Sequence, residues 1–257
     1  MQFWFSWRHQ MKAFSKDYFV VSVDMRGYGE TDRPPNTSDY TLAHLSQDIT
    51  ELIPALGYTK CTALVGHDWG GAIAWATTAQ RPDLIKKLIV MNCPHPKIFQ
   101  RNVSGNWAQL MKSWYMFMFR IPKLPEFIFS MRDFSYFNGI FRGRKAGVRN
   151  RAAFPPDTVE AYKYIFSQPG ALTPPINYIR CVFDVDKSFY RSISKKIENE
   201  TLLIWGDCDL FLESSMADNH SDLVPNLTVK HIPDCSHWVQ QDAYEKVNEL
   251  MTEFLDR

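Results

Sequence analysis

Three residues whose side chains suit covalent hydrolysis each follow a short apolar run. Asp68 is the central residue of G-H-D-W-G (66–70), where a G-x-S-x-G turn would carry a nucleophilic serine. Asp209 lies in G-D-C-D after L-L-I-W, and His237 follows a run that continues into I-P-D-C-S-H-W. A carboxylate that attacks carbon forms an ester, and a base must then activate water to hydrolyse it. We therefore interpret Asp68 as nucleophile, His237 as base and Asp209 as the acid that orients the base.

Each of these residues also has a plainer interpretation. Asp68 alone fits the cap of a helix, and His237 alone fits a packed or surface histidine. Asp207 is the alternative acid in the same G-D-C-D stretch. Asn92 stands at the end of another apolar run, so that loop offers an amide and no acid. The occurrence of all three candidates after apolar runs, in the order nucleophile, acid, histidine, favours catalysis.

The runs that carry these residues alternate with helical patterns. The apolar composition of five runs predicts buried parallel strands, over 17–24, 61–66, 86–92, 200–206 and 227–233. Helical periodicity is found in three segments, 41–57, 70–80 and 243–255. The first of these helices should begin at Tyr40 or Thr41 and end at Gly57. Alternating strands and helices predict an α/β fold, with a mostly parallel sheet covered by helices on both faces.

The region from about 95 to 195 interrupts this alternation. It is rich in aromatic residues, methionine and proline, and it contains helical patterns but no convincing strand. We predict a core made of 1–95 and 196–257 and a helical cap made of 96–195, lying over the carboxyl ends of the strands. Gly27-Tyr28-Gly29 follows the first predicted strand but lacks the third glycine of a dinucleotide-binding motif, so it predicts a turn.

Composition excludes several classes of function. The 257 residues carry a net charge of +1, which does not favour nucleic acid as a partner. No apolar run reaches the roughly 18 residues that span a bilayer. The five cysteines form no C-x-x-C pair, and the other histidines show no metal-ligand spacing, so we expect no metal and no cofactor.

Six motifs along the chain carry a resemblance to a known family. They are FWFSWRHQM, VDMRGYGETDRP, LVGHDWGGAIAW, FSQPGAL, LLIWGDCDLFL and CSHWVQQD. Together they resemble the epoxide hydrolases of the α/β-hydrolase fold, most closely the vertebrate types 3 and 4. The resemblance implies Asp68 as nucleophile, His237 as base and Asp209 as its partner. It also implies that the backbone N–H of Trp69 helps to bind an oxyanion.

The family uses two cap tyrosines to protonate the opened epoxide ring. Tyr115, seven residues before Pro122, matches the first. The second lies in an N-x-Y-R segment, which here reads Asn177-Tyr178-Ile179-Arg180. Either Tyr178 substitutes after a local shift or one acid is lost, and adjacent helical residues point about 100° apart.

A second departure concerns the H-G-x-P loop that the family places before FWFSWRHQM. No His-Gly pair occurs in the chain, and the strands that precede this loop in the family are missing too. The resemblance therefore implies an amino-terminally truncated family member, with activity impaired by the missing loop and by Ile179.

The expected function is hydrolysis of a lipophilic epoxide to a vicinal diol through an aspartyl ester. A haloalkane dehalogenase-like hydrolase and a non-catalytic isoform with a binding role are the alternatives. Full-length relatives resemble membrane-anchored proteins, whereas this chain offers no membrane segment. We expect a cytoplasmic protein or one peripheral to the endoplasmic reticulum membrane, and the sequence leaves its oligomeric state open.

Overall fold

A parallel sheet of four strands forms the centre of the protein, for which a computed structural model describes residues 2–183 and 186–257. The strands follow the order β1-β2-β3-β4, and their bounds are Cys61–His67, Ile85–Met91, Glu200–Gly206 and Leu227–Ile232. All neighbouring pairs are parallel, with Gly66 opposite Val90 and Val90 opposite Leu203. Four of the five predicted strands are therefore confirmed, together with the α/β class.

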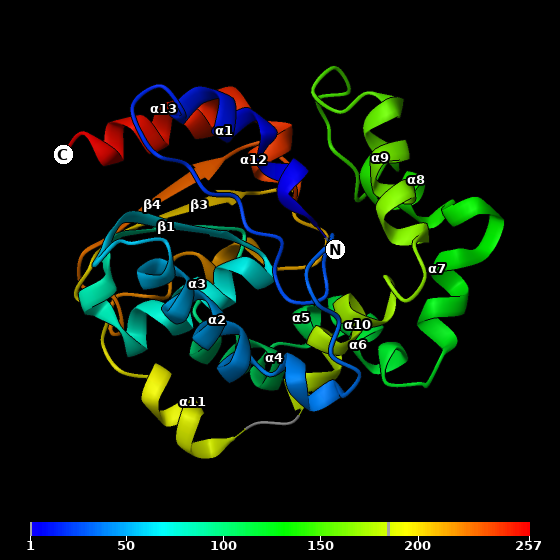
Figure 1. Cartoon of the computed structure of the whole chain (residues 1–257), viewed down its shortest axis with the longest axis horizontal. Helices are drawn as coiled ribbons and strands as arrows, with labels where there is room; N and C mark the ends of the chain where they lie inside the picture. The colour runs from blue at the N-terminus through cyan, green and yellow to red at the C-terminus, as the bar shows by residue number, and fades with distance from the viewer. Residues whose placement is uncertain (1, 184–185) are drawn as a thin grey trace.

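Alternating side chains of the central strand β2 enter two separate cores. Leu88 and Val90 pack in a cluster with Trp75 of α3, whereas Ile89 and Met91 pack in a cluster with Phe254 of α13. This alternation follows from the two-residue period of a strand. The sheet is thus covered on both faces, as Figure 1 shows, by α2 (Leu42–Ala55) and α3 (Trp69–Gln80) on one side. The other face carries α1 (Arg8–Phe14) and α13 (Tyr244–Leu255).

The three helices expected in the core are also present. The predicted start of α2 is confirmed, because Thr41 is its N-cap and the Thr41 side chain accepts a hydrogen bond from the backbone N–H of His44. The helix stops just before Gly57, whose φ of 85° lies in the left-handed region that favours glycine.

The prediction of a strand over 17–24 is wrong. This segment has no regular secondary structure, and residues 19–23 make no backbone hydrogen bond within the described ranges. A cavity of about 570 Å³ is lined by this segment on one side and by β1 on the other. Phe19 and Val21 remain 71% and 44% exposed. The segment has the apolar composition of a strand, but a strand also needs a hydrogen-bonded neighbour, and none of the described residues pairs with it.

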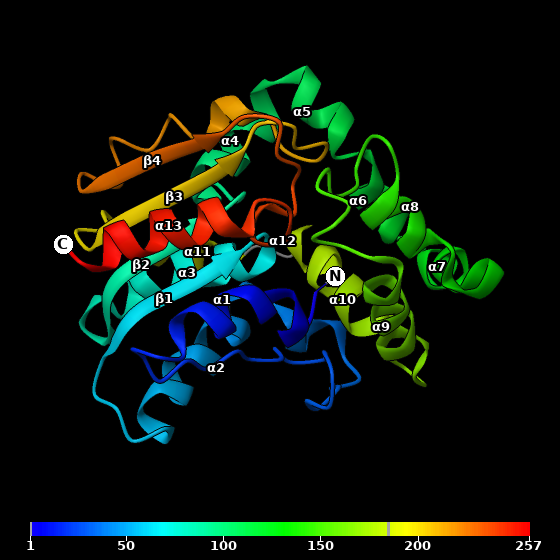
Figure 2. The same cartoon turned by 90° about the horizontal axis from the view of Figure 1, so that it is seen from above.

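Helices alone make up the described part of the region between β2 and β3. These helices are α4 (Pro96–Gly105), α5 (Trp107–Lys112), α6 (Trp114–Phe119), α7 (Leu124–Phe134), α8 (Tyr136–Arg142), α9 (Pro156–Ser167), α10 (Thr173–Arg180) and α11 (Lys187–Ile193). Figure 2 shows α5 to α10 beyond the arrowheads of the strands, at the carboxyl end of the sheet. Open α/β sheets bind ligands at this end. The short helix α12 (Val239–Asp242) follows β4.

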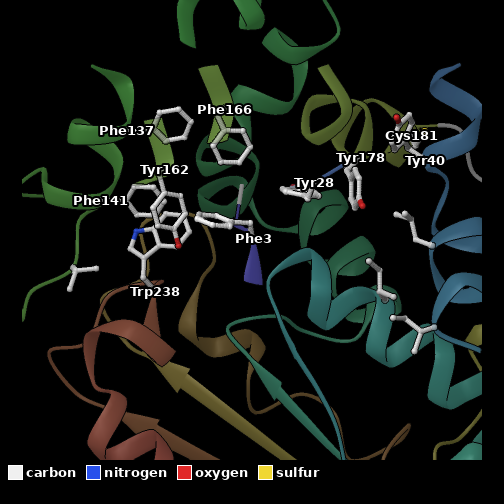
Figure 3. Packing of buried hydrophobic residues seen from close by; sticks show 14 of the residues in the cluster. Phe3, Tyr28, Tyr40, Phe137, Phe141, Tyr162, Phe166, Tyr178, Cys181 and Trp238 are labelled. Atoms are coloured by element: carbon white, nitrogen blue, oxygen red, sulfur yellow. The ribbon is translucent and has the colours of Figure 1, made fainter. Parts of the chain in front are cut away.

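A cluster of stacked aromatic rings joins α8 and α9 to the loop after β4 (Figure 3). Phe141 is fully buried, and its ring lies 4.3 Å from that of Tyr162 and 4.7 Å from that of Trp238. The Trp238 indole N–H donates to the carbonyls of Ile140 and Ala146. Because Trp238 follows His237 directly, this packing also fixes the loop that carries the candidate base.

Replacing Phe141 by alanine should therefore destabilise the fold. We expect the free energy of unfolding to fall by about 3–5 kcal/mol, as for other buried Phe→Ala changes, when measured by chemical denaturation. Phe127→Ala is the matched control, because Phe127 is 63% exposed, and its effect should stay within about 0.5 kcal/mol. Equal effects of the two substitutions would contradict the packing described here.

Two buried histidines lie behind α3 in contact with each other. The backbone N–H of His95 donates to Nε2 of His220 at 3.0 Å, and the His220 ring stacks on Trp75. Burial lowers the pKa of His95 to about 3 and that of His220 to about 4. Both rings are therefore neutral in the folded protein at pH 5, whereas unfolding returns them to an ordinary pKa near 6.5.

The fold should consequently lose stability in mild acid. Because the unfolded state binds more protons, the free energy of unfolding should fall between pH 7 and pH 5, by at most about 1.4 kcal/mol per pH unit for each ring. Denaturant titrations at the two pH values measure this. His231→Asn is the control, because His231 is partly exposed. Burial would lower its pKa, but Asp207 and Asp218 raise it overall, so His231 does not cause the loss and the loss should persist in this variant. A stability that is constant or higher at pH 5 would contradict the account.

Candidate active site

Asp68 occupies a strained turn between β1 and α3. Its φ of 52° is unusual for a residue with a side chain, and its ψ of −123° places it outside the helix. The turn is tight because a Cβ on Gly66 would collide with the backbone of Gly70. The Asp68 side chain makes no capping hydrogen bond to α3, so the simple helix-cap interpretation does not describe it.

The structure brings His237 and Asp209 together at the same end of the sheet. The Nδ1–H of His237 donates to Oδ2 of Asp209 at 2.7 Å, and Nε2 faces Oδ1 of Asp68 at 3.7 Å. The latter distance is longer than a direct hydrogen bond. His237 is 3% exposed and Asp209 is 5% exposed, whereas the Asp68 side chain is 34% exposed. The buried carboxylate of Asp209 thus fixes Nδ1 of the imidazole, and Nε2 points toward the more exposed carboxylate of Asp68.

The charges of this group shift two pKa values in opposite directions. Burial would raise the pKa of Asp209, but His237 and hydrogen bonds from Asn92 and the Phe211 N–H lower it below its ordinary value. Burial would lower the pKa of His237, but the charges of Asp209 and Asp68 raise it overall. Asp209 is therefore ionised at neutral pH. Asp207, the alternative acid, instead binds the ring of His231 on the surface.

Two residues that hold this arrangement were not predicted. Asn92 donates to Oδ2 of Asp209 at 2.7 Å while its own oxygen accepts from the Gly206 N–H. Asp242 accepts from the backbone N–H groups of Ser236 and Arg149, and so ties the loop before His237 to the cap. Asn92 was noticed in the sequence only as an amide at a strand end. Asp242 has no signal there, because its role depends on backbone groups distant in the chain.

His67 lies beside the base and supports its backbone. The Nε2–H of His67 donates to the carbonyl of His237 at 2.7 Å. Burial lowers the pKa of His67 to about 3, so the ring is neutral.

A cavity of about 980 Å³ opens between the sheet and the cap helices. Asp68, Trp69, Tyr115 and His237 all line it, and most of the remaining wall is apolar. Tyr115 lies on α6, with its ring 6.0 Å from that of Phe211. Burial, followed by the charges of Asp68 and Asp209, raises the pKa of Tyr115, so its hydroxyl keeps its proton.

Trp69 is the first residue of α3. Its N–H, in the first turn of α3, makes no backbone hydrogen bond to any described residue. It is therefore free to bind an anionic oxygen, which the helix dipole also favours.

Tyr178 is placed differently from the expectation. It lies on α10, and its hydroxyl donates to the carbonyl of Arg26 at 2.7 Å. It does not line the 980 Å³ cavity, whereas its neighbour Ile179 does. The suggestion that Tyr178 substitutes for a second cap tyrosine gains no support from this position. The two adjacent residues face different sides of the helix, as their spacing requires.

Two further features bear on ligands and membranes. Among the described residues, no group of three or more His, Cys, Asp or Glu side chains is arranged to hold a metal ion. No helix in 2–183 or 186–257 has the length and apolar character needed to cross a bilayer.

Comparison with known proteins agrees with this geometry. The family model of the alpha/beta hydrolase fold matches residues 4–244. The chain is 42% identical to human epoxide hydrolase 4 over 99% of its own length and 69% of the human protein. It is 40% identical to epoxide hydrolase 3 of Xenopus tropicalis over 98% of the chain and 68% of that protein.

A solved structure gives the same result. The crystal structure of a Bacillus megaterium epoxide hydrolase bound to an inhibitor superposes with a TM-score of 0.89 at 29% identity. The superposition covers 100% of this chain and 90% of the bacterial one. The chain belongs to the α/β-hydrolase fold family and, within it, to the epoxide hydrolases.

Proposed function

We propose that the protein converts a lipophilic epoxide into a vicinal diol through an ester on Asp68. The observation that carries the proposal is the position of His237, which links the buried Asp209 to the exposed carboxylate of Asp68. A carboxylate on a tight turn is well placed for nucleophilic attack, and a base beside it can release the product. The mostly apolar wall of the 980 Å³ cavity supports a lipophilic substrate.

In the first step, a carboxylate oxygen of Asp68 attacks the less hindered ring carbon. The carbon–oxygen bond of the ring breaks, and its electron pair goes to the ring oxygen. Tyr115 gives its proton to that oxygen and later regains one, through solvent, from the imidazolium that His237 forms in the second step. Its protonated hydroxyl and its place in the cavity with Asp68 support this role.

In the second step, Nε2 of His237 takes a proton from water, and the resulting hydroxide attacks the ester carbonyl. The Trp69 N–H binds the oxyanion that forms. The intermediate then collapses: the bond between the ester carbon and the diol oxygen breaks, the diol leaves with the proton of the added hydroxyl, and Asp68 is again a carboxylate. Ester formation has already neutralised Asp68, so one of the two charges that raise the pKa of His237 is gone. The base is therefore more readily neutral when it must accept a proton.

Replacing His237 by glutamine should trap the intermediate. Asp68 can still attack, but no base activates water, so an adduct equal to the mass of the epoxide should accumulate on the peptide that contains Asp68. Intact-protein and peptide mass spectrometry measure it with a styrene oxide-type substrate. Asp68→Asn is the control and should carry no adduct.

The products separate the alternatives. Release of diol by the wild-type protein supports the proposal, whereas release of halide from a matched haloalkane would favour a dehalogenase. A folded His237→Gln protein that forms no adduct would contradict an ester mechanism and favour a binding role.

Asn92→Ala should slow the second step more than the first. The substitution removes a hydrogen bond to the charged Asp209, which is worth about 1.5–3 kcal/mol, and so weakens the hold on His237. We expect ester hydrolysis to slow by about 10- to 100-fold, with ester formation nearly unchanged, in single-turnover experiments. Asn219→Ala is the control, because Asn219 is exposed and bonds only to the Ser215 carbonyl. Equal slowing of both steps would contradict this role of Asn92.

A further inference from the structure

Tyr28 projects from a tight turn that follows the segment 17–24. Gly27 and Gly29, on either side of it, have φ of 86° and 52°. The Tyr28 N–H donates to the Met25 carbonyl, and the Gly27 N–H donates to the Asp32 carbonyl. A side chain on Gly29 would collide with the Asp24 carboxylate. The turn predicted for this segment is thus confirmed, and it holds Tyr28 in one position.

The ring of Tyr28 lies at the meeting point of the two cavities. Tyr28, Asp68 and Trp69 line both the 980 Å³ cavity and the 570 Å³ cavity beside β1. The side chain is 7% exposed, and its ring packs edge-on against those of Tyr178 and Phe166 at 5.4 and 6.2 Å. Figure 3 shows the ring between Phe3 and Tyr178.

The hydroxyl of Tyr28 has no hydrogen-bond partner in the described part of the chain, although neighbouring buried tyrosines have one. Tyr178 donates to the Arg26 carbonyl, Tyr40 donates to the Pro34 carbonyl, and Tyr162 contacts Gln241. Because Tyr28 lines both cavities, its hydroxyl is available to donate a hydrogen bond to a ligand there.

The electrostatic surroundings select Tyr28 over another phenol of the same cavity. Burial and then the charge of Asp68 raise the pKa of Tyr28, as they do for Tyr115. Tyr136 also lines the cavity, but burial alone raises its pKa, to about 12. Tyr28 and Tyr115 both line the cavity with Asp68, and both hydroxyls keep their protons there. They reach the cavity from different parts of the fold, the turn at 27–29 and helix α6.

We propose that Tyr28 is the second hydroxyl donor to the epoxide oxygen, in the place that Tyr178 does not fill. This inference rests on the proposed function. As Asp68 bonds to the ring carbon and the ring carbon–oxygen bond breaks, Tyr115 transfers its proton to the oxygen. Tyr28 keeps its proton and donates a hydrogen bond to the same oxygen, which stabilises the negative charge that develops there. The proton that His237 takes from water in the second step returns to Tyr115 through solvent, so the proton count balances.

Tyrosine-to-phenylalanine variants test this role without changing the packing of the ring. Tyr28→Phe should slow ester formation at Asp68 by about 10- to 100-fold in single-turnover experiments and leave ester hydrolysis nearly unchanged. The double variant Tyr28→Phe/Tyr115→Phe should be slower than either single variant. Tyr178→Phe and Tyr40→Phe are matched controls. Each removes a structural hydrogen bond from a buried tyrosine that does not line the 980 Å³ cavity, and neither should change ester formation by more than about twofold.

A second readout does not depend on turnover. Phenylacetamide offers a carbonyl oxygen that accepts hydrogen bonds as the epoxide oxygen does, and calorimetry measures its dissociation constant. Tyr28→Phe should weaken its binding about 10-fold, whereas Tyr178→Phe should not. If the wild-type protein forms no ester, the proposed function fails, and weakened amide binding would still support the donor role. If Tyr28→Phe matches the controls in both measurements, or if the wild type neither reacts nor binds the amide, the inference is overturned.

Discussion

The hydrogen bond between His237 and Asp209 is the interaction on which the rest of the site depends. A carboxylate with almost no exposure to solvent is costly unless its oxygens are bonded, and here four donors satisfy Asp209. The same bond fixes the tautomer of His237, so that Nε2 can accept a proton beside Asp68. Loss of this bond would leave a buried charge without its partner and an imidazole without an orientation.

The fold serves this interaction through loops that leave the carboxyl ends of the strands. Asp68, Asn92 and Asp209 follow β1, β2 and β3, and His237 lies beyond β4. Because the strands are parallel, all four residues lie at the carboxyl end of the sheet. The helical region between β2 and β3 stabilises the same end of the sheet, because the ring of Trp238 packs against Phe141 of α8 and Asp242 accepts a hydrogen bond from the Arg149 N–H. Residues 233–242 therefore contribute both to the stability of the fold and to the geometry of the site.

The sequence predicts the regular elements of the fold, whose patterns repeat along the chain. Apolar runs predicted the four strands, and Thr41 marked the start of a helix. Prediction was wrong for 17–24, because composition reports the tendency of a segment and not the presence of a neighbouring strand. Roles that depend on distant backbone groups were also missed, as for Asp242. Tyr28 appeared in the sequence merely as part of a turn, since the cavity beside it is formed by segments far apart in the chain.

Isotope labelling of a single turnover tests the central claim most directly. In the proposed mechanism, a single turnover in water enriched in ¹⁸O, with enzyme in excess over epoxide, has His237-activated water attack the ester carbonyl of Asp68. The account predicts that the first diol released contains no ¹⁸O and that the label enters the Asp68 carboxylate. Label found in the diol of this first turnover, with none on Asp68, would show that water attacks the epoxide directly and would contradict the account.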